Sequence, residues 1–251
     1  MAENLANLFF SDLKFSQPYK AHETYYFKSG SAEKKSLNRQ VYNGIFIVKT
    51  AVAPENALNE TLELINSANR SLYVEQFYAY KYFGRANKGS VKETPNLFLK
   101  ACLEAARRGV DVKIILDSTW YNTERENPMS NFYTVEYLNR VAHRENLNLQ
   151  AKLGCFSDGI KKYHVKGLVV DNKAVMLGSM NWNLNSPTRN REVDLIIYGK
   201  PAGYFSKAFM HDWKLCSEKK KKKREVNYSY IIAGSIIIFI FIFRKRIKRQ
   251  S

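Results

Sequence analysis

Cysteine is scarce in this chain, and its few copies are poorly placed for cross-linking. The 251 residues include three, Cys102, Cys155 and Cys216, which are widely spaced and form no C-x-x-C pair. A disulfide framework or a structural zinc site needs paired or clustered cysteines, so the sequence argues against both. No other set of metal ligands stands at a recognisable spacing, and we expect no metal and no cofactor.

The N-terminus lacks the features of a secretory signal peptide. Its first residues, MAENLANLFFSDLKF, show no basic region followed by an unbroken apolar run. Residues 1–48 as a whole are polar and aromatic without a clear period. We expect them to form a peripheral extension or to be the remnant of a longer chain, and we assign no fold to them.

A strong basic charge over the whole chain is also missing, although the total suggests one. The formal net charge is +17 at pH 7, but residues 219–251 hold 11 of the lysines and arginines and one acid, Glu225. The rest of the chain therefore has a net charge of only +7. The basic charge is mostly a property of the C-terminal tail, and it is weak evidence for nucleic-acid binding by the folded part.

One long hydrophobic run is present, and it lies near the C-terminus. Residues 226–243 (VNYSYIIAGSIIIFIFIF) carry no charge and lie between a basic linker at 218–225 and a basic tail at 244–251. A helix of this length spans roughly 27 Å, close to the thickness of a bilayer core, and the flanking cations suit the headgroups. We therefore expect a single-pass transmembrane helix that anchors the protein in membrane lipid. Both flanks are basic, so the side on which the body lies stays open.

Residues 49–217 alternate between helical and extended patterns, which predicts one α/β domain. Leu58, Leu62 and Ile65, for example, share one face of a helix. Helices are expected at 55–68, 95–108, 131–145 and 202–215, and strands at 71–79, 110–117, 147–153, 165–171, 174–179 and 192–199. Helices that alternate with strands imply a mixed β-sheet flanked by helices.

The clearest chemical pattern lies at 163–183 (YHVKGLVVDNKAVMLGSMNWN), which reads H-x-K-x4-D-x6-G-S-x-N. Alternate residues of a strand share a face, so His164 and Lys166 are expected to point towards one pocket. Ser179 and Asn181 do the same at the end of the next strand, and a hairpin brings the two pairs together. An imidazole is a nucleophile near neutral pH, while an ammonium and an amide stabilise the charge on phosphoryl oxygens.

This pattern resembles the HKD motif of the phospholipase D superfamily. The segments EQFYAYKYFG, AARRGVDVKIILDSTWYN and NWNLNSPTRNREVDLII are also similar to phospholipase D-like proteins of archaea, which often end in a membrane segment. The resemblance covers roughly residues 50–215 and implies a phospholipase D-like mixed sheet. The catalytic set that it implies is His164, Lys166, Asp171 and Glu192, and the phosphate-binding set is Lys166, Ser179 and Asn181. It further implies that Glu192 hydrogen-bonds the ring of His164 and that Asp171 has a supporting role.

The chemistry implied by the resemblance is a double displacement that needs two HKD motifs. His164 would form a phosphohistidine while a second histidine protonates the leaving alcohol. This chain has one such motif, because none of the other histidines, His22, His143 and His211, is followed by lysine at the second position. Two alternatives stay open: a symmetric homodimer that pairs two motifs, or the second half of a two-motif enzyme.

The function expected from the sequence is a membrane-anchored phosphodiesterase that acts on phospholipid or nucleic acid. The anchor favours a lipid substrate, whereas single-motif members of the family are often nucleases. The alternatives are a phosphatidyltransferase of the cardiolipin synthase kind and a non-catalytic membrane module that binds phosphate or lipid.

Overall fold

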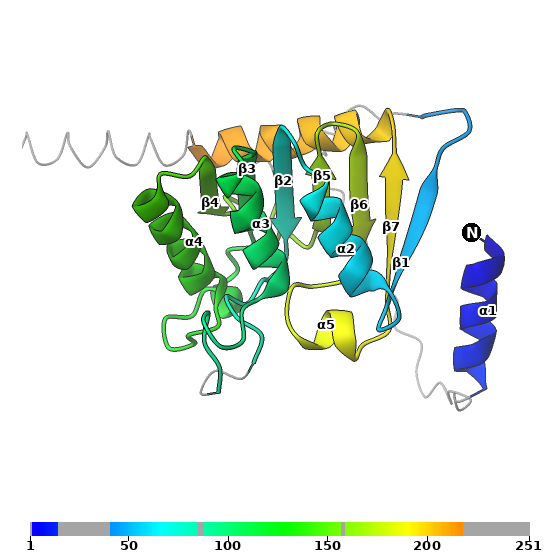
Figure 1. The fold of residues 1–251 in the computed structure, drawn as a ribbon, viewed down its shortest axis with the longest axis horizontal. Helices are drawn as coiled ribbons and strands as arrows, with labels where there is room; N and C mark the ends of the chain where they lie inside the picture. Colours follow the sequence, from blue (N-terminus) through cyan, green and yellow to red (C-terminus); the bar gives the residue numbers. More distant parts are fainter. Residues whose placement is uncertain (1, 15–40, 85–87, 157–158, 218–251) are drawn as a thin grey trace, which may run out of the picture.

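The computed structural model describes residues 2–14, 41–84, 88–156 and 159–217, and a seven-stranded sheet lies at its centre (Figure 1). The strands are β1 (Val48–Ala53), β2 (Ser71–Gln76), β3 (Asp111–Leu116), β4 (Leu149–Leu153), β5 (Lys166–Val170), β6 (Ala174–Gly178) and β7 (Glu192–Tyr198). Their order is β1-β7-β6-β5-β2-β3-β4, in which β2, β3 and β4 run parallel and the other neighbours antiparallel. The predicted mixed sheet is confirmed.

Helices cover both faces of this sheet. They are α1 (Ala2–Leu13), α2 (Ala57–Asn66), α3 (Leu97–Arg107), the 3-10 helix η1 (Trp120–Asn122), α4 (Asn131–Glu145) and α5 (Asn185–Thr188), and residues 201–217 are helical as well. In Figure 1, α2, α3 and α4 lie in front of the sheet and the helix of residues 201–217 runs behind its upper part. The predicted α/β class with flanking helices is therefore confirmed.

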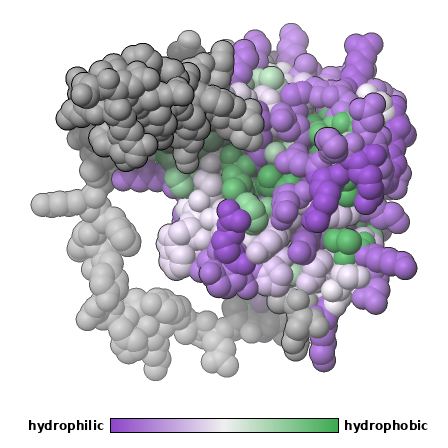
Figure 2. Space-filling model, turned by 90° about the vertical axis from the view of Figure 1, so that its left-hand side faces the viewer, coloured by the Kyte–Doolittle hydropathy of each residue, from purple (hydrophilic) through white to green (hydrophobic). Residues whose placement is uncertain are grey.

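Strand alternation divides the interior into cores on the two faces. On β2, Leu72 and Val74 belong to the large core beneath α2 and α3. Tyr73 points to the other face, where its ring stacks on Phe209 at a centroid distance of 5.1 Å and an interplanar angle of 6°. On the side where α4 lies, the surface is mainly hydrophilic and hydrophobic side chains show as smaller patches (Figure 2). The period of two read from the sequence thus sets which helix each strand residue contacts.

Asn96 shows how one polar side chain joins a helix to the sheet. Its Oδ1 caps α3 by accepting hydrogen bonds from the backbone N–H groups of Phe98 at 3.0 Å and Leu99 at 3.3 Å. Its Nδ2 donates to the carbonyl oxygens of Tyr80 at 2.7 Å and Trp182 at 2.9 Å. The segments that follow β2 and β6 are therefore fixed to the start of α3.

The β5–β6 hairpin forms as predicted, but its turn lies one residue earlier than expected. Asp171 and Asn172 have φ values of 54° and 57°, and the Lys173 N–H bonds the Val170 carbonyl oxygen at 2.8 Å. Two central residues with positive φ define a type I′ turn, which asparagine and aspartate tolerate well. Asp171 is therefore a turn residue and not the last residue of the strand.

The described part of residues 1–48, which the sequence left unassigned, contains α1 and the first residue of β1. α1 lies beside β1 in Figure 1, and β1 begins at Val48 as the edge strand next to β7. Arg191 links α1 to the domain, because its guanidinium bonds Asp12 at 3.1 Å and Glu55 at 2.5 Å. No helix in the described parts of the chain is long and apolar enough to cross a bilayer. The segments at 218–225, 226–243 and 244–251 lie outside the described residues.

Candidate active site

The polar residues of the motif come together at one edge of the sheet. β2, β3 and β6 end at this edge, whereas β5 and β7 begin there. Lys166 starts β5 and lies opposite Gln76 at the end of β2, while Gly178 at the end of β6 lies opposite Asp194 of β7. In Figure 1 this is the lower edge of the sheet, above α5. Segments far apart in the sequence therefore place their loops around one point.

Lys166 holds its ammonium against the ring of His164. Its Nζ lies 3.0 Å from Nδ1 and 3.2 Å from Nε2 of that ring, and it donates a hydrogen bond of 3.1 Å to the His164 carbonyl oxygen. The ring of Phe77 covers both groups, with its centroid 4.4 Å from the His164 ring and 4.8 Å from Nζ. The two side chains share one face, with Lys166 buried and His164 exposed.

Desolvation and nearby cations lower the pKa of His164 below its ordinary value of 6.5. Desolvation is the largest cause, followed by the charges of two neighbouring lysines. Desolvation also lowers the pKa of Lys166, against the opposing effect of Glu192, Asp117 and Asp194. The neutral imidazole is therefore the prevailing form of His164 at neutral pH, and this form has the unprotonated ring nitrogen that a nucleophile needs.

A buried carboxylate that the sequence analysis did not single out fixes the backbone before His164. Asp117 follows β3, and its Oδ1 accepts a hydrogen bond of 2.8 Å from the Tyr163 N–H. Its Oδ2 accepts from the Thr119 N–H at 2.8 Å and from Nδ2 of Asn122 at 3.0 Å. The acid ends the apolar stretch VKIILD, and that contrast is the signal by which the sequence could have revealed it. The position of the His164 backbone thus depends on the end of β3.

Ser179 and Asn181 lie at the same edge, just after β6. The hydroxyl oxygen of Ser179 accepts a hydrogen bond of 3.2 Å from the Val193 N–H, which ties this turn to β7. The side-chain oxygen of Asn181 is buried and has no hydrogen-bond partner among the described residues. A buried polar atom without a partner is costly, and such atoms concentrate at functional sites.

Glu192 takes a different partner from the one that the family resemblance implies. Its Oε1 accepts a hydrogen bond of 3.1 Å from Nδ2 of Asn190, and within the described residues it makes none to the His164 ring. Its negative charge raises the pKa of Lys166 and opposes the effect of burial. Glu192 therefore acts on the pair through Lys166.

Asp194, on β7, supplies a second buried carboxylate beneath the strand ends. Its Oδ1 accepts a hydrogen bond of 3.3 Å from the Met180 N–H, and its Oδ2 is buried without a partner in the described chain. Burial raises the pKa of Asp194 to about 6. Gly178 leaves room for this carboxylate, because a Cβ there would lie 1.7 Å from Oδ1. The turn after β6 is thus seated on a carboxylate that the sequence analysis missed.

Asp171 lies at the opposite edge of the sheet, which fits the supporting role that the resemblance implies for it and not a contact with the reacting groups. Its carboxylate accepts hydrogen bonds of 3.0, 2.8 and 2.8 Å from the backbone N–H groups of Asn69, Arg70 and Ser71. The length of β5 separates it from Lys166 by roughly 16 Å, at about 3.3 Å per strand residue. Asp171 therefore fixes the start of β2 and does not reach the His164 ring.

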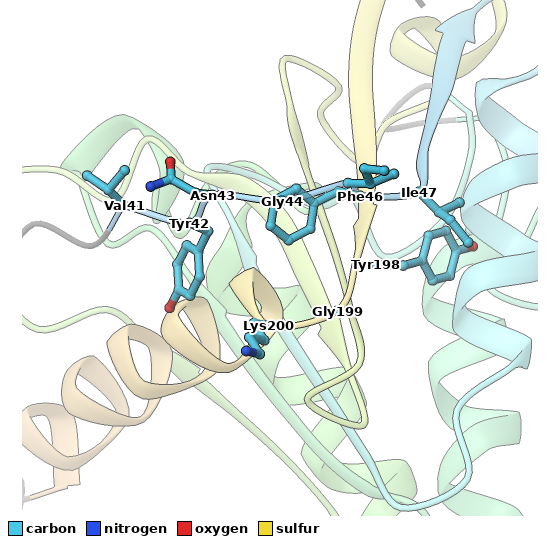
Figure 3. A pocket seen from close by; sticks show the side chains of 10 residues that line it. Val41, Tyr42, Asn43, Gly44, Phe46, Ile47, Tyr198, Gly199 and Lys200 are labelled. Atoms are coloured by element: carbon cyan, nitrogen blue, oxygen red, sulfur yellow. The ribbon is translucent and has the colours of Figure 1, made fainter.

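Two cavities differ in their distance from the His164–Lys166 pair. The nearer one, of about 410 Å³, is lined by residues of the segments after β2 and β6 and around α5: Tyr78, Tyr80, Gly84, Asn183, Leu184, Asn185 and Arg189. The larger one, of about 660 Å³, lies between the segment at 41–47 and Tyr198–Lys200 (Figure 3). Tyr198 ends β7, so the larger cavity is at the edge of the sheet away from the motif.

Among the described residues, no three His, Cys, Asp or Glu side chains gather as metal ligands.

Comparisons with known proteins identify the family that this chain resembles. A family model described as "Cardiolipin synthase, PLD-like domain" matches residues 61–213. A cardiolipin synthase of Clostridium perfringens is 27% identical over 161 residues, which are 64% of this chain and 29% of that protein. The chain thus spans less than a third of the curated relatives that it matches.

Two solved structures are similar to this chain. The phospholipase D family member Nuc from Salmonella typhimurium has a TM-score of 0.50 and 26% identity, and the match covers 68% of this chain and 95% of Nuc. NucT from Helicobacter pylori has a TM-score of 0.49 and 21% identity over 68% of this chain and 98% of NucT.

Proposed function

The chain belongs to the phospholipase D-like family, and we propose that it is a membrane-anchored phosphodiesterase with His164 as its nucleophile. The observation that carries the proposal is the contact between the Lys166 ammonium and the His164 ring at 3.0 Å. It places a cation for the phosphate oxygens beside a ring nitrogen that attacks the phosphorus. The membrane anchor is the segment at 226–243.

The proposed reaction proceeds in two displacements. A ring nitrogen of His164 attacks the phosphorus, the bond from phosphorus to the leaving oxygen breaks, and a second histidine gives its proton to the departing alcohol. Water then attacks the phosphohistidine, loses its proton to that second histidine, and the N–P bond breaks. Lys166, Ser179 and Asn181 hold the non-bridging oxygens of the phosphate. The negative charge of Glu192 favours the protonated form of Lys166.

The second histidine comes from a second HKD motif, which we propose is supplied by another copy of this chain. The match covers 95% of Nuc, so a family member consisting of little more than this domain exists. Two identical edges that face each other across a twofold axis would provide both histidines. The alternative is a separate half that carries the other motif, as the match to 29% of a cardiolipin synthase allows.

A phosphatidyltransferase is the second candidate, because the matching family model is named for cardiolipin synthase. The first displacement is the same, and the hydroxyl of an acceptor alcohol replaces water in the second. Incubation with acyl-labelled phosphatidylglycerol separates the two. A transferase joins the phosphatidyl group to a second phosphatidylglycerol and releases glycerol, whereas a hydrolase releases glycerol and leaves phosphatidic acid.

The decisive experiment compares full-length protein in detergent with His164→Ala and with His143→Ala as the matched control, since His143 is an exposed residue of α4. Substrates are bis(4-nitrophenyl) phosphate, labelled phosphatidylglycerol and single-stranded DNA. We expect turnover of at least one, lost in His164→Ala and retained in His143→Ala. Binding without turnover that survives His164→Ala would instead identify a non-catalytic module.

Mixing the two chains tests the shared site. If each site needs His164 from both copies, equal co-expression of the native chain and His164→Ala leaves about a quarter of the dimers active by random pairing. Activity that falls only to about half would show that the two copies work independently.

A further inference from the structure

The cavity of about 410 Å³ is lined by residues of the loops at the same edge of the sheet as the proposed catalytic pair. Tyr78, which lines it, directly follows Phe77, and the Phe77 ring covers His164 and Lys166. The ring centroids of Phe77 and Tyr78 lie 5.6 Å apart, so Phe77 connects the pair to the wall of the cavity. When the scissile phosphodiester is held at Lys166, the substituent on one side of it therefore lies beside Tyr78.

Two stacked phenol rings form one wall of this cavity. Tyr78 and Tyr80 lie two residues apart on an extended segment, and their rings stack at a centroid distance of 5.4 Å and an angle of 29°. The Tyr78 hydroxyl oxygen accepts a hydrogen bond of 2.8 Å from Nδ2 of Asn183, which holds its ring in place. Burial raises the pKa of both phenols, so they stay neutral. The wall is planar, aromatic and uncharged.

Among the described residues that line the cavity, Arg189 is the one cation. Within the described chain its guanidinium has no ion pair, and the residue is exposed. Arg191, two residues on, pairs with Glu55 and Asp12. Arg189 is therefore placed to receive an anion of the substrate, beyond the phosphate held at Lys166.

A second combination of ring and cation lies beside Phe77. Tyr121 lies 6.3 Å from Phe77, and Lys162 lies 5.3 Å from the Tyr121 ring centroid. Trp120 is 74% exposed. Aromatic rings interleaved with cations are the pattern that binds single-stranded nucleic acid, because bases stack on the rings while phosphates contact the cations.

The residues at this edge of the sheet fit the acyl chain of a lipid less well. The strongly exposed aliphatic side chains of the domain, Val41, Ile45 and Ile47, line the other cavity at the far edge of the sheet. The cavity beside Phe77 is instead lined mainly by phenols, carboxamides and a guanidinium. Such a lining suits a planar, hydrogen-bonding group that carries a second phosphate.

We propose that Tyr78, Tyr80 and Arg189 form a subsite for the nucleotide next to the scissile phosphodiester, which makes single-stranded nucleic acid the substrate of this site. The base stacks on the tyrosine pair and the adjacent phosphate contacts Arg189. This inference rests on the proposed function, since it takes Lys166 and His164 as the place of the scissile phosphate.

The test measures binding without turnover. A fluorescent oligodeoxythymidine is titrated with full-length protein in detergent in the His164→Ala background, and its anisotropy is followed at several salt concentrations. We expect Tyr80→Leu to weaken binding about ten-fold, as for loss of one stacked base, while Tyr80→Phe keeps the ring and the affinity. Arg189→Gln should reduce the slope of log affinity against log salt by about 0.7, the value for one phosphate contact on a single strand.

The matched control for Arg189→Gln is Arg144→Gln, which removes the same charge from an exposed residue of α4 that pairs with Glu145. It should leave the salt slope unchanged. Equal effects of the two arginine variants, or an affinity of Tyr80→Leu equal to that of Tyr80→Phe, would overturn the subsite. So would Arg189-dependent binding of soluble short-chain phosphatidylglycerol by a protein that does not bind the oligonucleotide.

These outcomes are separate from the test of the proposed function. Hydrolysis of bis(4-nitrophenyl) phosphate by the protein with intact His164 requires no nucleotide subsite. If this hydrolysis is absent, the result counts against the proposed phosphodiesterase activity. The anisotropy results test only the nucleotide subsite.

Discussion

Replacement of Glu75 by glutamine should abolish part of the pH dependence of stability. Glu75 lies on β2, on the face covered by the helix of residues 201–217, and only 9% of it is exposed. Burial, and then the charge of Asp212 on that helix, raise its pKa from 4.5 to about 8. The folded protein therefore keeps Glu75 protonated at neutral pH, whereas the unfolded chain ionises it.

The sign and size follow from linkage. A pKa that is raised on folding stabilises the folded state fully below pH 4.5, and this contribution is lost as the pH rises to about 8. The upper limit is about 1.4 kcal/mol per pH unit in that interval. We expect this slope over a narrower interval than the shift implies, because water reaches part of the side chain and reduces the pKa shift. Glutamine stays neutral, so Glu75→Gln should be the more stable protein at pH 8 and close to the native chain at low pH.

Urea unfolding of the full-length protein in mild detergent measures this difference. The buried Trp182 and Trp213 report unfolding by their fluorescence, and titrations run from pH 5 to 8. Glu63→Gln is the control, because Glu63 is an exposed acid of α2. If the free energies of unfolding of Glu75→Gln and the native chain fall in parallel with pH, Glu75 is not protonated in the folded state and the reasoning is refuted.

Three further predictions concern the two edges of the sheet. Gly178→Ala should cost about 2 kcal/mol of stability and much of the activity, because its Cβ would lie 1.7 Å from Asp194 Oδ1. Gly203→Ala, whose Cβ meets nothing within 4 Å in a helix, should be tolerated, and equal thermal melts of the two variants would contradict the account. Asp171→Asn keeps the turn residue type but weakens three charge-assisted hydrogen bonds. It should lower the unfolding free energy by about 1–2 kcal/mol with kcat unchanged, and a selective loss of kcat would return Asp171 to the site. The acid limb of kcat/KM should have its midpoint below 6.5, because the pKa of the nucleophilic His164 is lowered. A midpoint above 6.5 in the pH profile would rule out the neutral imidazole proposed here.

The hairpin that carries the motif could be predicted because its determinants are local. Strand alternation placed His164 and Lys166 on one face, and the contact between their side chains agrees with it. The turn was displaced by one residue, because D-N-K offers more than one pair of turn residues and the positive φ values select Asp171 and Asn172. Asp171 was assigned to the site by the family resemblance and not by this local pattern.

The supports of the site could not be predicted, because they join segments that are distant in sequence. Asp117 meets Tyr163 across 46 residues, and Asp194 meets Met180 across 14. Each acid interrupts an apolar strand pattern, but a single chain does not show what it bonds. The same holds for β1, whose edge position next to β7 depends on tertiary pairing.

The electrostatic balance at Lys166 explains why this edge suits a phosphate. Three carboxylates, Glu192, Asp117 and Asp194, lie close enough to raise the pKa of Lys166, yet desolvation outweighs them and the pKa is lowered. None of the three forms a salt bridge with it in the described chain, and Asp117 Oδ1 and Asp194 Oδ1 accept hydrogen bonds from backbone N–H groups instead. The ammonium is thus held, poorly hydrated, by the His164 ring and carbonyl oxygen. A phosphodiester that binds Lys166 therefore provides the anionic partner that the ammonium lacks in the described chain. It does so next to the nucleophilic nitrogen of His164.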